Sequence, residues 1–550
     1  MISDEFSEYY RDHLDGIHDC VDRIVLNAYF PLAQSGGGFR VWWRRLHGGE
    51  DDLDNAHLMR YAGRFARRIR AYASKRGIPL IECQRGERKH EVAGRYLPKD
   101  PAFRGLFCIL AGRVPAPVRD IQRCSNRQPH IARKTPQPYV NHYSFHIMDP
   151  QWGHLTIKLC PHPPFNAQIM LNGHEYVARQ ASKSNIPFAK EGNCFTQVSD
   201  AADLSRVAET MSAGSAVGRL VQVCERWIYS ACLVFALDLA EQERCGFRYA
   251  YSVYQCEYSR NLLFTRGRTM EEVFQGVIDR IRAPLDIKTV KTIFGYKNRP
   301  YHRDANGKLP RFQVAVERPV YDLTVFKVHF GKVTMKVYSK GKRVLRIEVI
   351  VHNTRDLRCG RRIDTFPQIV ASLKAILERF LSVLRSVDIS FLDDQTLETW
   401  PLPSKVGSTH VAGVNINQRR MRAVMEAVIA RSANPQGFTA SQIAGKVREI
   451  LGVPETGYHS RQASYDLKKL RGKCLVRKIA DSHSYHTTPE GLSAMAAFLV
   501  LRDKVLIPLL AGRGKRKTGR KPPNRSRIDL HYENIQIGMQ ELFRTLGIAA

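Results

Sequence analysis

Residues 326–352 read FKVHFGKVTMKVYSKGKRVLRIEVIVH, and three stretches within this segment decide the fold class. Apolar residues recur at alternate positions from Phe326 to Phe330, from Val333 to Tyr338 and from Val344 to His352. Such alternation is typical of strands with one buried face. Lys340-Gly341-Lys342 offers a turn before the last strand. The segment therefore predicts an antiparallel strand meander.

Strands and helices both surround this meander. His142–Met148 and Leu155–Leu159 alternate with period two on either side of the turn residues Asp149-Pro-Gln-Trp-Gly153, which predicts a hairpin. Phe366–Arg385 has the spacing of an amphipathic helix. We therefore predict a central mixed α/β domain with antiparallel strands over residues 139–394, and an α+β multidomain protein as a whole.

The N-terminal part, residues 1–111, is predicted to be a mostly helical domain. Its clearest helix is Leu58–Ala73, where Tyr61, Phe65, Ile69 and Tyr72 form one apolar stripe. Several arginines flank the stripe with no acid between them, and the planar guanidinium suits phosphate oxygens. We predict phosphate contacts there, and a merely solvated basic face is the alternative. The arginines assigned to this role are Arg60, Arg64, Arg67 and Arg68.

Composition marks the remaining boundaries. Residues 112–138 contain five prolines and six basic residues, which predicts a basic linker. A second linker is expected over 395–416, and a compact domain over 417–511. Residues 512–550 are expected to form a basic tail and a terminal helix, because Gly512–Arg527 holds eight basic residues, two prolines and no acid.

The domain over 417–511 is predicted to be a winged helix-turn-helix. Gln418–Arg431, a segment opened by Phe438-Thr-Ala-Ser-Gln442, and Ser460–Arg471 give three helices, and a hairpin follows within Cys474–His486. The third helix of such a unit enters a major groove. The side chains predicted to contact nucleic acid are Arg461, Gln462, Tyr465, Lys468, Lys469, Arg471 and Lys473 on the third helix, Arg477, Lys478, His483 and Tyr485 in the wing, and Lys515, Arg516, Lys517, Arg520 and Lys521 in the tail.

Net charge identifies the class of partner. The 550 residues include 85 Lys and Arg against 52 Asp and Glu, a formal charge of +33. A surplus of this size favours a polyanionic partner, DNA or RNA. No stretch approaches the roughly 20 apolar residues of a membrane span, and the first ten residues carry acids where a signal peptide needs a basic start. We therefore expect a cytoplasmic protein without a membrane partner.

Most sequence signatures of catalysis are absent. The chain has no P-loop, no Gly-x-Ser-x-Gly, no His-Glu-x-x-His and no Cys-x-x-Cys. What remains is three acids on predicted strands, Asp149, Glu257 and Glu348. Acids that converge at strand ends can bind Mg²⁺ for phosphodiester cleavage, so we predict these three as catalytic residues and magnesium ligands. The alternatives are ion pairs of Glu257 and Glu348 with Arg260 and Arg346, or a nucleophilic Tyr338.

Several segments resemble a widespread, uncharacterised bacterial family. The matching segments are Tyr143–Asp149, Asn172-Gly-His174, Gln255-Cys-Glu-Tyr258, Tyr338–Glu348 and, in some relatives, Tyr465–Lys473. The resemblance covers most of residues 140–510 and implies a repeated architecture and a mobile-element origin, but no established activity. Ser339 stands where the family has an aspartate, so a metal role for that aspartate does not transfer to this chain.

These observations predict a nucleic-acid-binding protein that takes DNA, structured RNA or both. The sharper hypothesis is a mobile-element-associated, Mg²⁺-dependent endonuclease or a replication or transposition factor. Two alternatives stay open: a non-catalytic RNA-binding subunit of a ribonucleoprotein, and a winged-helix transcriptional regulator.

Overall fold

The computed structural model of the chain is an α+β structure with a large mixed sheet. It describes residues 4–84, 86–123, 129–282, 291–294, 313–320, 323–330, 333–357, 359–386, 398–432, 434, 437–479, 482–501, 534, 537 and 538. The chain divides into two compact units. The larger unit comprises Tyr10–Gly276 and Thr289–Leu377, and the smaller comprises Met1–Tyr9, Val277–Lys288 and Glu378–Ala550.

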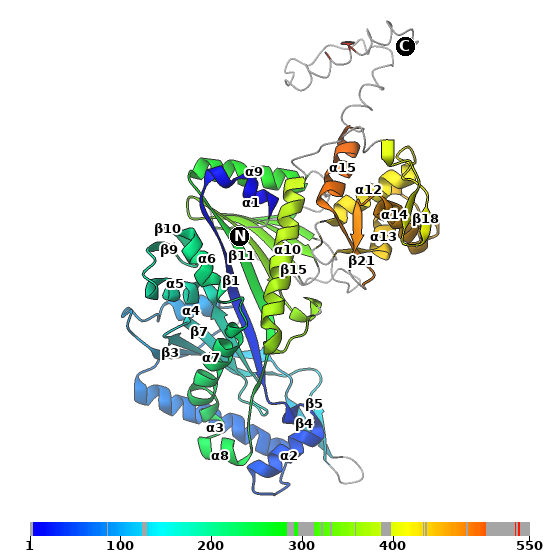
Figure 1. The fold of residues 1–550 in the computed structure, drawn as a ribbon. Coiled ribbons are helices and arrows are strands. Elements are labelled where there is room, and N and C mark those ends of the chain that lie inside the picture. The colour runs from blue at the N-terminus through cyan, green and yellow to red at the C-terminus, as the bar shows by residue number, and fades with distance from the viewer. Residues whose placement is uncertain are drawn as a thin grey trace. The chain divides into compact units, whose positions relative to one another are not determined.

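The larger unit is built on one sheet. The strands described in it are β1 (Leu14–Tyr29), β2 (Leu80–Glu82), β3 (Gly105–Pro115), β6 (Tyr139–Asp149), β7 (Gly153–Leu159), β8 (Ala167–Asn172), β11 (Ala250–Phe264), β12 (Lys291–Phe294), β13 (Gln313–Val320), β14 (Leu323–Phe330), β15 (Val333–Lys340) and β16 (Val344–Val351). Their order is β12-β13-β14-β15-β16-β11-β1-β8-β7-β6-β3-β2 (Figure 1). Neighbours run antiparallel except in the outermost pairs, β2–β3 and β12–β13, which are parallel.

The sheet has two halves with the same topology, and they meet at the antiparallel pair β1–β11. Outward from β1 the strands follow as β8, β7, β6, β3 and β2, and outward from β11 as β16, β15, β14, β13 and β12. In each half the innermost strand comes first in the sequence, the short parallel edge strand comes second, and the remaining strands return toward the centre. The order therefore has an internal pseudo-twofold relation, and β1–β11 is its axis.

The predicted meander and hairpin are confirmed. The meander of residues 326–352 corresponds to β14, β15 and β16, and Gly341 in its last turn has a φ of +59°. That angle suits glycine, because it has no Cβ to clash. The predicted hairpin is β6–β7, closed by the pair Asp149 and Gly153.

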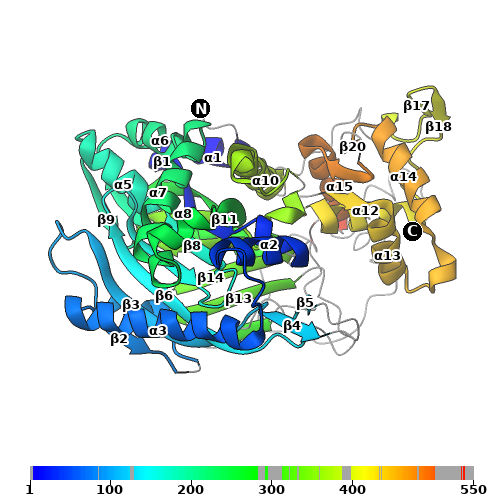
Figure 2. The same cartoon turned by 90° about the horizontal axis from the view of Figure 1, so that it is seen from below.

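The two faces of the sheet differ in chemistry. On β6 and β7, Tyr143, Phe145, Ile147, Leu155 and Ile157 point to one face, which we call the apolar face. Their neighbours His142, Ser144, His146, His154 and Thr156 point to the other, the polar face. The ring of Phe65 packs against Tyr143 and Phe145 on the apolar face, and Figure 2 shows its helix, α3 (Asn55–Arg76), alongside β6 and β3.

Helices in the larger unit lie between or after these strands. They are α2 (Gly36–Leu46), α3, α4 (Lys89–Gly94), α5 (Gly173–Lys183), α6 (Ala201–Glu209), α7 (Ser215–Ala231) and α8 (Leu239–Arg244), while α9 (Gly267–Arg282) and α10 (Phe366–Ser386) continue past the boundaries of the unit. A short hairpin, β9 (Phe188–Glu191) and β10 (Cys194–Val198), follows α5.

The prediction that residues 1–111 are mostly helical was wrong for three segments. The expected helix at Leu58–Ala73 lies within α3, but Leu14–Tyr29 is the central strand β1, Leu80–Glu82 is β2, and Gly105–Pro115 is β3. Polar residues hide the strand pattern of β1, and a β-bulge between Val21 and Ile24 shifts its register. Its polar side chains find partners only in the folded sheet, so local alternation could not reveal it.

Residues 112–138 do not behave as an unpacked linker over their described length. They include the end of β3 and a hairpin of β4 (Arg119–Arg123) and β5 (Pro129–Arg133). The Arg119 guanidinium is buried and donates hydrogen bonds to the carbonyl oxygens of Ala33 and Gln34 at 2.7 and 2.5 Å. Packing of this arginine fixes the hairpin to the body of the larger unit.

The smaller unit contains a compact helical region. Its elements are α12 (Arg419–Ser432), β19 (Phe438–Thr439), α13 (Ala440–Leu451), α14 (Ser460–Gly472), β20 (Val476–Lys478), β21 (Ser484–Thr487) and α15 (Pro489–Leu501), with strand order β19-β21-β20. Val428, Ile443, Val447, Leu467 and Leu470 belong to its core. A capping box starts α13, because the Thr439 side chain accepts from the backbone of Gln442 while the Gln442 side chain accepts from the backbone of Thr439.

Residues 395–416, predicted as a linker, include the hairpin β17 (Ser404–Val406) and β18 (Thr409–Val411), which contacts α14. The predicted basic tail and terminal helix over 512–550 lie almost wholly outside the described residues. No described helix is long and apolar enough to cross a membrane.

Candidate functional site

Two of the three predicted acids lie together on the polar face. Glu257 is on β11 and Glu348 is on β16, and the register places Ser259 opposite Glu348 and Ile350 opposite Glu257. The two carboxylates are therefore diagonal neighbours on one face, a separation of roughly 7–8 Å between their backbones. We call Glu257 and Glu348 the acid pair.

Neighbouring side chains contact each member of the acid pair. Lys336 of β15 donates to Glu348 at 3.0 Å, and the Tyr338 hydroxyl lies 3.4 Å from the same oxygen. Gln255 donates to Glu257 at 2.8 Å. Burial, and then the charge of Glu348, raise the pKa of Glu257 to about 7.

The expected alternative partners of these acids are engaged elsewhere. Arg260 lies on the face of β11 opposite to Glu257 and pairs with Asp19 at 2.7 Å. Arg346 shares the face of Glu348 but bonds to Asp22. Burial raises the pKa of Tyr338, so the phenol is held protonated rather than activated as a nucleophile.

Asp149 does not belong to the acid pair. It ends β6, which lies four strands from β11 in the sheet order, about 19 Å at the usual spacing. Its carboxylate accepts from the backbone of Gln151 and Trp152 at 2.7 and 2.9 Å and from the side chains of Arg226 and Trp227 at 2.9 and 2.8 Å. The three acids therefore do not form one site, and Asp149 fixes the β6–β7 turn to α7.

The sequence alone did not identify a buried ionic network beside the acid pair. Asp22 of β1 bonds to both Arg346 of β16 and His174 of α5, and all three side chains are nearly inaccessible to solvent. Arg346 also donates to the carbonyl oxygen of Asn193 at 2.8 Å, and Ser259 donates to Asp22 at 3.1 Å. We call Asp22, His174 and Arg346 the buried triad.

The Asn172-Gly-His174 turn places His174 in the buried triad. The Asn172 side chain caps α5 by accepting from the backbone of His174 at 3.0 Å. A Cβ at position 173 would lie 1.7 Å from the carbonyl oxygen of Val21, so only glycine lets the helix start this close to β1. This close approach gives the Asn172-Gly-His174 turn a structural role that the sequence alone did not indicate.

Cys20 lies beside this network. One ligand atom each from Cys20, Asp22 and His174 falls within 4.8 Å of the others. A thiol, a carboxylate and an imidazole suit Zn²⁺ better than Mg²⁺, which prefers oxygen ligands. The Arg346 guanidinium already neutralises Asp22: burial alone would raise the pKa of Asp22, but Arg346 and His174 together lower it below its usual range. The cluster therefore acts as an ionic network that joins β1, α5 and β16.

The acid pair gives a first prediction. Because the pKa of Glu257 rises from 4.5 to about 7 on folding, this carboxyl destabilises the fold progressively as pH rises between those values. Glu257→Gln removes the charge, so at pH 8 the variant is expected to be more stable by about 1–2 kcal/mol after allowance for partial exposure, with no difference at pH 4. Urea unfolding across this pH range measures the effect, and parallel pH profiles for the two proteins would contradict it.

The predicted arginines of α3 divide into two groups. Arg64 bonds to Glu241 and to the carbonyl oxygen of Ala236, and Arg68 lies 3.6 Å from Asp238. Arg60 and Arg67 are exposed and form no ion pair with any described residue. Half of the predicted set is therefore used inside the protein, and half faces solvent.

On α14 the predicted residues also separate by exposure. Arg461, Tyr465 and Lys468 are spaced i, i+4 and i+7 and so lie on one face of the helix, which we call the α14 stripe; Arg461 and Tyr465 are exposed, and Lys468 is half-buried. Lys469 is buried, lies 3.4 Å from the buried Asp466 and stacks over Tyr465. The Gln462 side chain accepts from the backbone of His459 at 2.9 Å and so caps the helix. Lys469 and Gln462 therefore have structural contacts.

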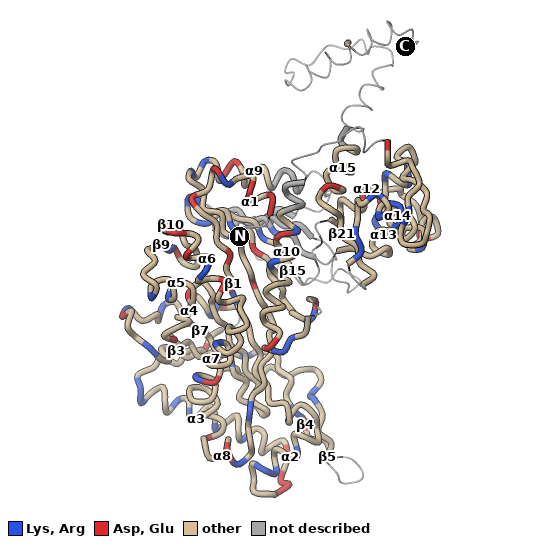
Figure 3. Tube along the Cα trace, viewed as in Figure 1, with Lys and Arg blue, Asp and Glu red and all other residues tan. Residues whose placement is uncertain are grey.

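The remaining predicted residues of the smaller unit are mixed. Arg477 and Lys478 on β20 are exposed, as is His483 in the following turn. Arg471, Lys473 and Tyr485 are half-buried, and Tyr485 packs against the core. Figure 3 shows basic residues along both α3 and α14. Lys515, Arg516, Lys517, Arg520 and Lys521 lie outside the described residues.

Comparison with known proteins gives no relative: no family model, curated protein or solved structure matches this chain.

Proposed function

We propose that the protein binds nucleic acid through α14 of a C-terminal winged helix. The order α12, β19, α13, α14, β20, β21, with β21 between the other two strands, is the arrangement expected of a winged helix-turn-helix. The α14 stripe on the third helix carries the proposal. It offers the exposed Arg461 and Tyr465 and the half-buried Lys468, and the exposed Arg477 and Lys478 lie on the wing strand β20.

The charge of the whole chain supports the same partner. A surplus of 33 positive charges repels basic surfaces and attracts acidic ones, so it concentrates a polyanion around the protein. The exposed Arg60 and Arg67 of α3 would add contacts to phosphate that carry no sequence information.

Salt dependence tests this proposal. If six or more phosphates are neutralised, the affinity of the full chain for a duplex of about 30 base pairs should fall by roughly 10³-fold or more between about 50 and 200 mM KCl. Fluorescence anisotropy over a KCl series gives the slope of log affinity against log salt. A slope near zero would rule out a phosphate-dominated interface.

The same assay distinguishes DNA from RNA. A helix such as α14 fits the major groove of B-form DNA, whereas the major groove of A-form RNA is too narrow for side chains to read. We therefore propose duplex DNA as the ligand of α14. Tighter binding to the RNA duplex of the same sequence would favour a ribonucleoprotein subunit instead.

A second candidate function is Mg²⁺-dependent strand cleavage at the acid pair. It is favoured by one observation, the proximity of Glu257, Glu348 and Lys336 on a partly accessible sheet face. Glu257 and Glu348 could hold a magnesium ion, which would polarise a phosphodiester, and Lys336 would stabilise the negative charge that develops there. Cleavage of labelled DNA that needs Mg²⁺ and is lost in Glu257→Gln would support this function, and equal cleavage by both proteins would exclude the acid pair.

A further inference from the structure

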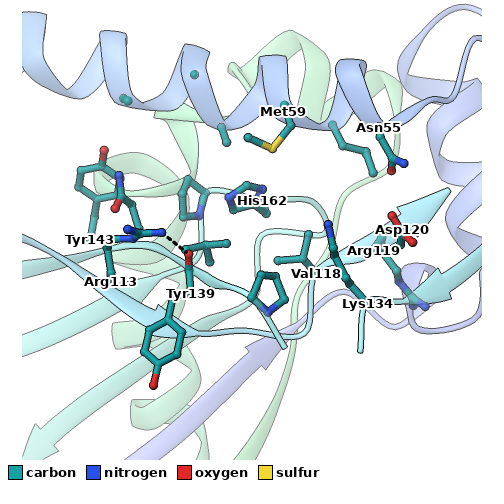
Figure 4. A pocket seen from close by; sticks show the side chains of 18 residues that line it. Asn55, Met59, Arg113, Val118, Arg119, Asp120, Lys134, Tyr139, Tyr143 and His162 are labelled. Carbon is teal, nitrogen blue, oxygen red and sulfur yellow. Dashed lines mark hydrogen bonds between the residues drawn. The ribbon is translucent and has the colours of Figure 1, made fainter. Parts of the chain in front are cut away.

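A cavity of about 730 Å³ lies in the larger unit between α3 and the segments around β4, β5 and β6 (Figure 4). These are the arginine-rich helix and the proline-rich basic segment, which are separate in the sequence. One wall is α3, which presents Leu58, Met59, Ala62, Gly63 and Ala66. Apart from Asn55 at the start of the helix, this wall is apolar and mostly small, so a flat apolar group can approach the helix closely.

Two large apolar side chains that line this cavity are unusually exposed. Met59 is 60% exposed and Tyr139 is 61% exposed. Figure 4 shows Met59 on the α3 side and the Tyr139 ring at the far edge, pointing away from the helix. Exposed aromatic and thioether groups at a cavity edge are favourable surfaces for stacking planar ligands.

Cations surround the same opening. Arg113 and Lys134 line the cavity and are exposed. Arg113 donates to the carbonyl oxygen of Tyr139 at 3.1 Å, which holds its guanidinium beside the tyrosine, and Lys134 has no ion pair with any described residue. One acid, Asp120, is among the lining residues, and Gln122 donates to it at 3.3 Å. The opening therefore carries a net positive charge.

The exposed arginines of α3 extend this basic edge. Arg67 follows Gly63 by one turn, and Arg70 follows Ala66 by one turn, so both lie next to the cavity wall. The structural cation Arg119 is excluded, because its guanidinium is buried against Ala33 and Gln34. The cavity thus combines an apolar wall and exposed planar surface with accessible cations at its edge.

We propose that this cavity binds a segment of single-stranded nucleic acid, with one base against Met59, another against Tyr139 at the opposite edge, and phosphates at Arg113, Lys134 and Arg67. This inference rests on the proposed function only in the class of partner, because α14 is a separate contact. Apolar surfaces at the edge of a cavity can reach bases only when these are unstacked, so a single strand fits and a duplex does not. Single-stranded DNA and single-stranded RNA both offer bases and phosphates, so either polymer can bind in this way.

The test uses the full chain and fluorescein-labelled 15-mers of dT and rU. Tyr139→Ala combined with Arg113→Ala is expected to lower affinity for the single strands at least about tenfold. Tyr139→Ala alone should account for much of the loss, because stacking is removed while the charge is kept. Tyr96→Ala combined with Arg95→Ala, an exposed tyrosine and arginine after α4, is the matched control and should leave affinity unchanged.

Two further measurements separate the outcomes. An oligonucleotide with 5-iodouracil should crosslink to Tyr139, identified by mass spectrometry. Duplex binding should be unchanged in the cavity variant, whereas a variant with Arg461, Tyr465 and Lys468 replaced together by alanine should lose duplex binding and keep single-strand binding. Equal single-strand affinity for wild type and cavity variant, or equal losses in cavity and control variants, would overturn this inference and leave the role of α14 intact. If the α14 variant instead keeps full affinity for the duplex while the cavity variant loses single-strand affinity, only the proposed function is overturned.

Discussion

Replacing Arg461, Tyr465 and Lys468 together by alanine is expected to weaken binding of the full chain to duplex DNA by about 100-fold or more. The three side chains lie on one face of α14, with Arg461 and Tyr465 exposed and Lys468 half-buried, so the substitution removes two cations and one planar surface from the proposed interface. The slope of log affinity against log salt should also become shallower by about 2, one for each lost phosphate contact. Anisotropy titrations at several KCl concentrations give both quantities.

The fold of the smaller unit provides the controls for this experiment. Arg419 is exposed at the start of α12, and Arg419→Ala removes a charge outside the α14 stripe, so it should change affinity by less than about threefold. Lys469→Ala should act differently again. It removes one partner of the buried Asp466, which Tyr458 and Arg420 also contact at 2.9 and 3.2 Å, so it should lower stability more than affinity. Full affinity in the triple variant would refute α14 as the contact.

Substitution of Arg346 by methionine is expected to destabilise the larger unit by about 3–5 kcal/mol at pH 7. The guanidinium is completely buried, bonds to Asp22 and lies 2.9 Å from His174 Nε2. Methionine fills similar volume but leaves the Asp22 carboxylate buried without its cation. Because the buried triad joins β1, α5 and β16, both halves of the sheet should loosen together, and urea unfolding followed by circular dichroism should show the loss.

Companion variants and pH separate the ion pair from simple packing. Arg343→Met removes an arginine whose partner, Asp15, is exposed, and it should cost less than about 1 kcal/mol. Asp22→Asn combined with Arg346→Met should recover part of the loss, because the unpaired charge is gone. The folded protein holds the pKa of Asp22 below its unfolded value, so the ion pair stabilises the fold above about pH 4 and its effect should vanish as pH falls further. An unchanged unfolding midpoint for Arg346→Met at pH 7 would show that the network adds no stability.

Local patterns predicted those elements whose neighbours are close in the sequence. The β14–β15–β16 meander and the β6–β7 hairpin follow from alternation and turn residues, because antiparallel neighbours joined by short turns share their apolar face. Of the predicted α3 stripe, Tyr61, Phe65 and Ile69 are buried as the spacing indicates, whereas Tyr72 is exposed. By contrast, β1 was not predicted as a strand, because Asp19 and Asp22 are typical of loops. Only the folded sheet brings their partners Arg260 and Arg346 beside them.

The candidate sites show the same division at the level of side chains. Glu257 and Glu348 were predicted as residues of one site, and the register of β11 and β16 places them together. Asp149 also lies on a strand, as the last residue of β6, yet the sheet order removes it by four strands. The arginines of α3 look alike in sequence, but Glu241 bonds to Arg64 from 177 residues away and leaves Arg67 exposed.

The sequence by itself determined the net charge of the protein, the strands and helices whose periodicity is local, and the residue types available for contacts with phosphate. Tertiary structure alone decided which of those cationic side chains remain exposed and available to bind phosphate. A guanidinium or ammonium group buried on folding must find a partner within the protein, because the loss of water around an unpaired charge costs several kcal/mol. That requirement pairs Arg64, Arg346 and Lys469 with acids, while Arg461 and Arg113 stay exposed and form no ion pair with any residue that the structure describes.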